Sequence, residues 1–434
     1  MGVLALSGCG VVGGEGELDI YALEPNEISP DELVTCEGEE CEEPGALRWS
    51  LPLDGEYVVP FEYDEYTAML PIETLEFTSG PIMTHRDGVV FLGERDILMA
   101  VDANTGERLW RESMESEHLR SIERLHVTDA GVLVSGNRPQ GEGRGMVLID
   151  VESGTGLNTF DDEWRSAWVQ RVDGNRVLLS AGADLYMMGD AESGEILWSA
   201  EVDEDERIIS GPLDGVLYAA DNPGRSGTTI LSSLSRIDGE TGQGLGRVDL
   251  SDEARAPRPA RSFTGTQEVI LSRLECDVEK CEPGGMSVVD GETGELLWDS
   301  RPFAFDVAEE DGRWLVNLRE GDDVRMVDAR TGEAVREDTP DAMENVGRLR
   351  TELEYPDGYG DPRRQVALRF PGQDATAWDG DVIGPELLSP GIDSENGPIA
   401  MVYGCAPDGL EPEPSDTSRP GSLCVKPRLF AIGS

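Results

Sequence analysis

The feature that most constrains this chain is a five-residue signal, Asp-x-x-Thr/Ser-Gly, that occurs six times. Its aspartates are Asp102, Asp150, Asp190, Asp238, Asp290 and Asp328, and its glycines are Gly106, Gly154, Gly194, Gly242, Gly294 and Gly332. Successive copies lie 38 to 52 residues apart. Self-similarity at such a period indicates that one supersecondary unit is used many times.

Each signal has the composition of a β-hairpin loop. Apolar runs precede it, as at residues 97–101, and follow it, as at residues 195–198, which is the pattern of two strands joined by a Gly-containing turn. The Asp carboxylate can accept a hydrogen bond from the backbone two residues further on, and the Ser or Thr hydroxyl can do the same. Gly takes the left-handed conformation that ends a short hairpin loop.

A tryptophan follows the Asp by eight residues in three of the repeats, as Trp110, Trp198 and Trp298. This fixed offset predicts a packing role that recurs in each unit. The period leaves room for four strands of roughly five residues plus turns, and four-stranded units at this period are propeller blades. No stretch of the sequence shows apolar residues at the spacing of an amphipathic helix. We therefore predict an all-β fold, a β-propeller with four-stranded antiparallel blades.

The two ends of the chain carry the two halves of one further hairpin. Residues 428–434 match the strand before a loop, and residues 46–50, which include Trp49, match the strand after one. Pairing these strands would remove two open sheet edges and close the propeller. A degenerate signal at residues 377–381 gives eight blades. The alternative is seven blades, with residues 340–390 as an insertion and a long loop at residues 338–362.

Residues 101–110 and 289–298 combine an apolar strand, Asp-x-x-Thr-Gly-Glu and Leu-Trp. This pattern resembles the pyrroloquinoline-quinone-type (PQQ-like) propeller repeat, and the resemblance covers most of residues 47–434. It implies the propeller fold and one of two functional branches. Quinoprotein dehydrogenases bind the quinone and calcium, and their pattern includes an adjacent Cys-Cys disulfide. Non-enzymatic lipoproteins include the propeller subunit of the outer-membrane β-barrel assembly machinery. No two cysteines are adjacent here, which favours the lipoprotein branch.

The chain of 434 residues has a formal net charge of −53. A propeller can hold a core of this size in one domain. The acidity disfavours nucleic acid and anionic lipid as partners and favours cations or basic proteins. The acidic runs at residues 161–163 and 201–206 are interpreted as solvated, because they lack the spaced oxygen ligands and turn glycine of a calcium loop.

Six of the seven cysteines are predicted to form three local disulfides. The pairs are Cys36 with Cys41, Cys276 with Cys281, and Cys405 with Cys424. Such bonds require an oxidising compartment. A zinc site would need Cys-x-x-Cys or histidine partners, and the three histidines and these spacings offer none. No metal site is therefore predicted.

The remaining cysteine, Cys9, ends the tetrapeptide Leu-Ser-Gly-Cys, which matches the bacterial lipobox. No basic region or full apolar run precedes it. Either the true start lies upstream or the match is accidental, and the odd cysteine count favours the former. Residues 1–9 are then the remnant of a signal peptide, residues 10–46 an acidic Gly- and Glu-rich tether, and residues 47–434 the propeller. Two acyl chains on Cys9 would anchor the protein in the cell envelope, outside the cytoplasmic membrane or in the periplasm.

No catalytic motif stands out. P-loop, H-E-x-x-H and G-x-S-x-G patterns are absent, and the G-x-G-x-x-G at residues 8–13 follows no strand. His118 and His126 are interpreted as structural, and Trp164 and Trp168 as core residues, with the propeller mouth as the alternative. We expect a monomeric, cofactor-free, non-catalytic scaffold that binds a protein through its loops. The alternatives are a cell-wall or polysaccharide-binding module and a PQQ-dependent dehydrogenase.

Overall fold

The computed structural model describes residues 33–36, 46–53, 57–60 and most of 81–336, with short segments beyond. Those segments are residues 366–368, 376–378, 383–392, 399–405, 410–412, 421–424 and 426–433. Gaps within 81–336 fall at residues 115–118, 139–142, 161–163, 165–166, 183, 204–205, 210–212, 214, 222–229, 253–255, 258, 265–266, 277–280, 302, 311–312 and 321–322. The regular elements of the described residues are β-strands, and no helix able to cross a membrane occurs among them.

Six antiparallel sheets of four strands follow one another along the chain. The first three consist of β4 (Ile82–Arg86), β5 (Val89–Glu94), β6 (Ile97–Asp102) and β7 (Arg108–Ser113); β8 (Ser121–Val127), β9 (Val132–Asn137), β10 (Arg144–Ile149) and β11 (Gly156–Thr159); and β12 (Trp168–Asp173), β13 (Arg176–Ala181), β14 (Leu185–Asp190) and β15 (Ile196–Glu201). The next three consist of β16 (Glu206–Ile208), β17 (Val216–Asp221), β19 (Ser233–Asp238) and β20 (Gly244–Asp249); β22 (Pro259–Thr264), β23 (Glu268–Cys276), β24 (Cys281–Asp290) and β25 (Leu296–Ser300); and β26 (Phe303–Glu310), β27 (Arg313–Glu320), β28 (Asp323–Asp328) and β29 (Ala334–Arg336). Four-stranded antiparallel units, as predicted, are confirmed.

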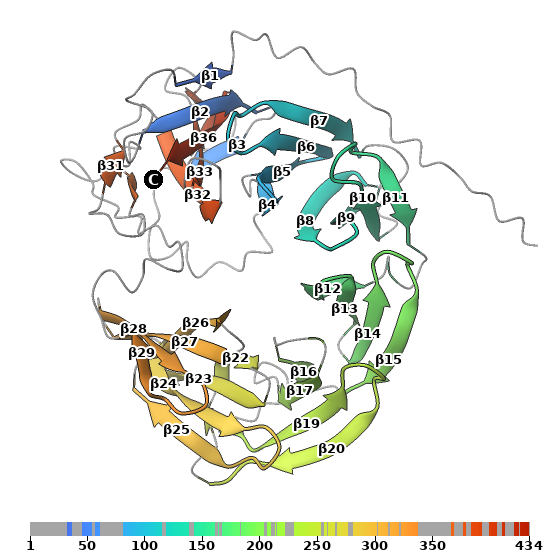
Figure 1. The fold of residues 1–434 in the computed structure, drawn as a ribbon, viewed down its shortest axis with the longest axis vertical. Helices are drawn as coiled ribbons and strands as arrows, with labels where there is room; N and C mark the ends of the chain where they lie inside the picture. Colours follow the sequence, from blue (N-terminus) through green and yellow to red (C-terminus); the bar gives the residue numbers. More distant parts are fainter. Residues whose placement is uncertain are drawn as a thin grey trace, which may run out of the picture.

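The middle strands of these sheets are buried on both faces. β5, β6, β13 and β14 each have four consecutive buried residues between half-buried ends. Such continuous burial is expected where both faces of a sheet are covered. In a sheet with one solvent-exposed face, buried and exposed residues alternate along each strand. Figure 1 shows the reason: the sheets stand side by side around an arc, with the first strands β4, β8 and β12 towards its middle and the fourth strands β7, β11 and β15 at its periphery.

The hydrophobic core is a series of layers between consecutive sheets. Val134 and Leu133 are neighbours on β9, yet Val134 packs with Phe91 of the preceding sheet and Leu133 packs with Val177 of the following one. This division follows from the strand period of two, which sends successive side chains to opposite faces. Such layers join each of the six sheets to the next one along the chain, so the order of these sheets in space repeats their order in the chain.

A composite sheet unites the two ends of the described chain. Its strand order is β1 (Val34–Thr35), β2 (Leu47–Pro52), β36 (Pro427–Gly433), β33 (Ile399–Cys405) and β32 (Ile383–Ile392). Trp49 lies opposite Ala431 and Leu51 opposite Leu429, so the predicted pairing of the Trp49 strand with the C-terminal strand is confirmed. The same residues pack against Val90 of β5. β1 lies in the segment interpreted as a tether and pairs with the outer edge of β2.

Three smaller sheets complete the described residues. They are β3 (Tyr57–Pro60) with β35 (Gly421–Cys424) and β34 (Leu410–Pro412); β18 (Ile230–Leu231) with β21 (Ala256–Pro257); and β30 (Val366–Leu368) with β31 (Thr376–Trp378). Trp378 of the predicted degenerate unit lies opposite Val366. Residues 379–381 of that unit, and the predicted long loop at 338–362, lie outside the described residues.

Candidate functional site

The six repeat loops share one hydrogen-bond pattern, which the first of them illustrates. Asp102 Oδ1 accepts hydrogen bonds from the backbone N–H groups of Asn104 (2.9 Å) and Thr105 (2.8 Å). The N–H of Gly106 donates to the Asp102 carbonyl at 2.9 Å, and Gly106 has a φ of 73°. Carboxylate, hydroxyl and left-handed glycine thus close the loop in the predicted way. The other five loops repeat the 2.8 to 3.0 Å bond from the glycine N–H to the Asp carbonyl.

These bonds also stabilise the ionised form of the loop carboxylates. The side-chain hydrogen bond from Ser153, followed by the backbone bond of the same residue, lowers the pKa of Asp150 below its ordinary value. The corresponding bonds from Thr241 lower the pKa of Asp238. Hydrogen bonds donated to a carboxylate favour its charged state. Asp150 and Asp238 therefore carry structural negative charges.

The recurring tryptophans join three of the sheets to a loop of the next sheet. The indole Nε1 of Trp110 donates to the carbonyl of Val151 at 3.0 Å, and that of Trp198 donates to the carbonyl of Gly239 at 2.9 Å. Trp298 makes the same bond to Ala329 at 2.9 Å. In every case the acceptor is the residue after the loop Asp. The predicted repeated packing role is confirmed, and we call this contact the indole latch.

Trp49 makes the latch across the composite sheet. Its Nε1 donates to the carbonyl of Ala103 at 2.8 Å, so β2 contacts the first loop as β7, β15 and β25 contact the loops of the sheets that follow them. In the one repeat where asparagine stands eight residues after the Asp, Asn158 Nδ2 donates instead to the carbonyl of Glu192 at 3.3 Å. The composite sheet therefore uses the connection of the other sheets.

The loop glycine is required for space as well as for conformation. A Cβ on Gly242 would lie 2.7 Å from Cδ2 of Trp198, and a Cβ on Gly106 would lie 2.6 Å from Cδ2 of Trp49. Real Cβ atoms do not approach ring carbons so closely. Combined with the positive φ at both positions, this contact explains why glycine closes the loops that lie beneath an indole.

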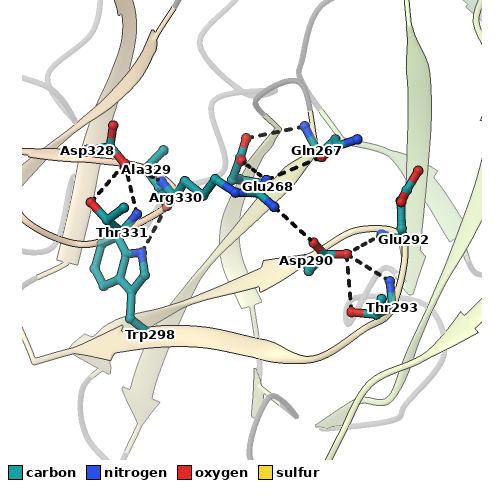
Figure 2. A network of polar contacts seen from close by, with 10 residues as sticks. All are labelled: Gln267, Glu268, Asp290, Glu292, Thr293, Trp298, Asp328, Ala329, Arg330 and Thr331. Carbon is teal, nitrogen blue, oxygen red and sulfur yellow. Dashed lines mark hydrogen bonds and ion pairs between the residues drawn. The ribbon is translucent and has the colours of Figure 1, made fainter.

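A second link between two loops is ionic. Arg330, which stands between Asp328 and Gly332, extends from its loop to the preceding sheet (Figure 2). There its Nη1 lies 2.9 Å from Glu268 Oε1 and its Nη2 lies 3.9 Å from Asp290 Oδ2. The Glu268 side chain is only 8% exposed, whereas Arg330 is 53% exposed. Arg330 therefore compensates a buried carboxylate and ties two loops together.

The loops and the fourth strands that follow them expose a mixture of acidic and apolar side chains to solvent. Their exposed glutamates are Glu107, Glu152, Glu192, Glu195, Glu240, Glu292, Glu295 and Glu333. Exposed apolar residues recur seven positions after the Asp, with 43% to 49% of each side chain accessible: Leu109, Leu157, Leu197, Leu245 and Val335. We call this surface the loop face. The sequence interpretation missed the apolar positions, although their constant offset from the Asp was visible.

The other residues singled out from the sequence have mixed outcomes. Trp164 is buried, as predicted, but Trp168 is 42% exposed, so its interpretation as a core residue is wrong. It begins β12, the innermost strand of its sheet. His126 is partly buried in its strand, and His118 lies outside the described residues. No cluster of metal-ligating side chains occurs among the described residues.

The predicted disulfides are only partly visible. Cys36 and Cys405 are each disulfide-bonded, and their predicted partners, Cys41 and Cys424, fall outside the described side chains, so those pairings stay predictions. Cys276 and Cys281 lie opposite each other in the register of β23 and β24. Cys9 lies outside the described residues.

Known proteins resemble this chain in part. Residues 95–243, which hold four of the six loops, match the family model PQQ_2, described as outer membrane protein assembly factor BamB. A curated relative, the quinohemoprotein alcohol dehydrogenase ADH-IIG of Pseudomonas putida, is 27% identical over 238 residues. That match covers 48% of this chain and 31% of the dehydrogenase, so it spans less than a third of the relative's length.

The matches among solved structures include three different proteins. The computationally designed Ika8 protein is 14% identical with a TM-score of 0.41, over 81% of this chain and 95% of its own. BamB from Moraxella catarrhalis is 14% identical with a TM-score of 0.36, over 93% and 98%. The Pan2 WD40 domain of Neurospora crassa is 11% identical with a TM-score of 0.36, over 57% and 74%.

Proposed function

The chain carries PQQ-like β-propeller repeats, and from that premise we propose that this protein is a non-catalytic scaffold of the bacterial cell envelope. It is anchored by lipid on Cys9 and binds another protein through its loop face. Its repeats form a closed propeller of eight blades, one of them the composite sheet. The observation that carries the proposal is the regular presentation of exposed glutamates and exposed leucines around loops that the indole latches hold rigid.

The chemistry of the loop face suits a partner with basic and apolar residues. Exposed carboxylates steer a positively charged partner during association, and the apolar side chains at Leu109, Leu157 and Leu197 supply area that becomes buried on contact. A scaffold also needs its contact residues fixed in advance, because ordering them on binding lowers affinity. The latch supplies this order at the loops of Asp102, Asp150, Asp238 and Asp328, because each of these loops is bonded to an indole of the sheet before it.

Site-specific photo-crosslinking in intact cells tests the binding role. A benzoylphenylalanine at Glu192 or Glu240, on the loop face, is expected to give one discrete protein adduct whose yield falls as salt rises. The control is Arg301, which is exposed and follows Ser300 at the end of its sheet opposite the Asp290 loop. Equal adducts from Arg301, or none from either loop position, would refute binding through the loop face.

A separate experiment tests the proposed location in the cell envelope. Metabolic labelling with a palmitate analogue is expected to modify the wild-type protein and not a Cys9→Ser variant. The variant is also expected to be lost from the membrane fraction. Labelling that persists in the variant would refute lipid attachment at Cys9.

The curated relative favours one alternative, a quinone-dependent dehydrogenase. Its printed name is that of a quinohemoprotein alcohol dehydrogenase, so catalysis is tested directly. We expect no dye-linked oxidation of alcohols or sugars after incubation with pyrroloquinoline quinone and calcium, and turnover would replace the scaffold proposal. Sedimentation with isolated cell wall tests the polysaccharide-binding alternative in the same way.

A further inference from the structure

One cluster of side chains lies on the face opposite the loops and takes no part in the proposed binding. Trp168 begins β12, and the Asp190 loop lies at the other end of the same sheet, where Arg176 pairs with Asp190. Arg144 begins β10 in the neighbouring sheet, whose loop likewise lies at the far end after Ile149. The two strand beginnings therefore share one face of the molecule.

Two guanidinium groups flank the indole of Trp168. The guanidinium of Arg144 lies over the ring, and that of Arg124, on β8, lies 5.6 Å from the ring centroid. Cations over an indole face are attracted by its quadrupole, and the contact limits the motion of both partners. The 42% of Trp168 that is exposed is therefore held beside two positive charges.

The positive charge of this cluster is only half compensated among the described residues. Glu123 forms an ion pair with Arg144 at 2.7 Å and also accepts a hydrogen bond from Asn137. Arg124 donates one hydrogen bond, to the carbonyl of Val169 at 3.3 Å, and no described carboxylate forms an ion pair with it. One excess positive charge thus stands beside an accessible indole in a chain of net charge −53.

An arginine has five N–H donors in a planar fork that matches the two oxygens of a carboxylate. Arg124 uses one of its donors for Val169, so further donors remain available towards solvent. An apolar group next to the carboxylate would rest against the open part of the Trp168 ring. We propose that Arg124 and Trp168, with Arg144 fixing the ring, form a binding site for a carboxylate group carried by an acidic, partly apolar peptide segment.

This site is independent of the loop face, so its fate does not decide the proposed function. The shared chemistry, an oxyanion on a guanidinium, also fits a small anion such as phosphate, and the experiment separates the two sources.

Collisional quenching of tryptophan fluorescence in the full-length protein measures the local charge at Trp168. A single positive charge 5.6 Å from the ring raises the local concentration of a monovalent anion about threefold in water. Iodide is therefore expected to quench a component of the emission more strongly than caesium does, despite the overall negative charge. Trp168→Phe should remove that component, and Arg124→Gln should lower its iodide quenching constant about threefold.

The matched control is Arg301→Gln, which removes an exposed arginine from another sheet and should change nothing. Stronger quenching of Trp168 by caesium than by iodide would overturn the charge assignment. So would an iodide constant that Arg124→Gln leaves unchanged.

Ligand protection tests the peptide. A blocked Leu-Glu-Leu-Glu peptide is expected to shield Trp168 from iodide, and the Leu-Gln-Leu-Gln peptide to leave it accessible. Arg124→Gln should abolish the shielding. Equal protection by both peptides would refute carboxylate recognition, and protection by inorganic phosphate without protection by the peptide would reassign the site to small oxyanions.

Discussion

The indole latch makes Gly106→Ala the most informative single substitution. The residue has a φ of 73°, and a Cβ would lie 2.6 Å from Cδ2 of Trp49. Alanine in the left-handed region costs roughly 1–2 kcal/mol. The overlap with a fully buried ring adds about 1–3 kcal/mol, and weakening the 2.8 Å bond from Trp49 to Ala103 adds to this. We expect a total destabilisation of about 3–5 kcal/mol.

A neighbouring glycine provides the matched control. Gly88 lies in the same sheet and has a φ of 76°, but a Cβ there would meet only Asn104 Nδ2 at 4.0 Å. Gly88→Ala should therefore cost the backbone contribution alone, about 1–2 kcal/mol. Urea unfolding of both variants gives the difference, which we expect to be about 2–3 kcal/mol.

The coupling between Gly106 and Trp49 identifies the cause of that difference. In a Trp49→Leu background the ring is gone, so the additional cost of Gly106→Ala should fall to that of Gly88→Ala. Equal costs for the two glycine variants in the wild-type chain would refute the latch at this position. A Gly106 cost that persists without Trp49 would refute the steric explanation.

The remaining predictions concern charge. Burial, and then the charge of Arg124, lower the pKa of His126 from 6.5 to about 4. Neutral His126 therefore contributes about 3 kcal/mol to the free energy of unfolding above pH 6.5, and this contribution is lost as the pH falls towards 4. In His126→Gln, the midpoint of urea unfolding should depend less on pH over that range. A pH dependence equal to that of the wild-type protein would contradict this explanation. Arg330→Met leaves Glu268 buried without its cation and should cost about 1–2 kcal/mol, a value discounted because Arg330 is half exposed. Adding Glu268→Gln to Arg330→Met should restore most of the lost stability in the same assay. If the stability losses of the two single variants simply add in the double variant, the two side chains do not interact.

The loops were predictable because their chemistry is local. Asp102, Thr105 and Gly106 determine their turn within five residues, and the sequence alone indicates each of their roles. The hairpin divided between the chain ends was also predictable, because Trp49 stands in the same pattern as Trp110. What the sequence did not show was the acceptor of each indole, since that carbonyl lies in the next repeat and no local pattern marks it.

Two features of the surface depended on contacts between distant residues. Trp164 and Trp168 are four residues apart, yet the first is buried and the second is 42% exposed beside arginines of the neighbouring sheet, which no local sequence pattern indicates. Arg330 did carry a signal. Four of the other five loops have glutamate at the same position, and this change of sign indicated a partner that only the fold could identify as Glu268.

The pairing of the two chain ends is the feature on which the scaffold depends most. Hydrogen–deuterium exchange of the full chain and of a chain ending at residue 426, which lacks β36, tests it directly. We predict that the deletion removes the amide protection of residues 47–52 and weakens that of residues 97–106, because β2 loses its neighbour and the first loop loses Trp49. Unchanged protection of residues 47–52 would contradict a sheet that contains both ends of the chain.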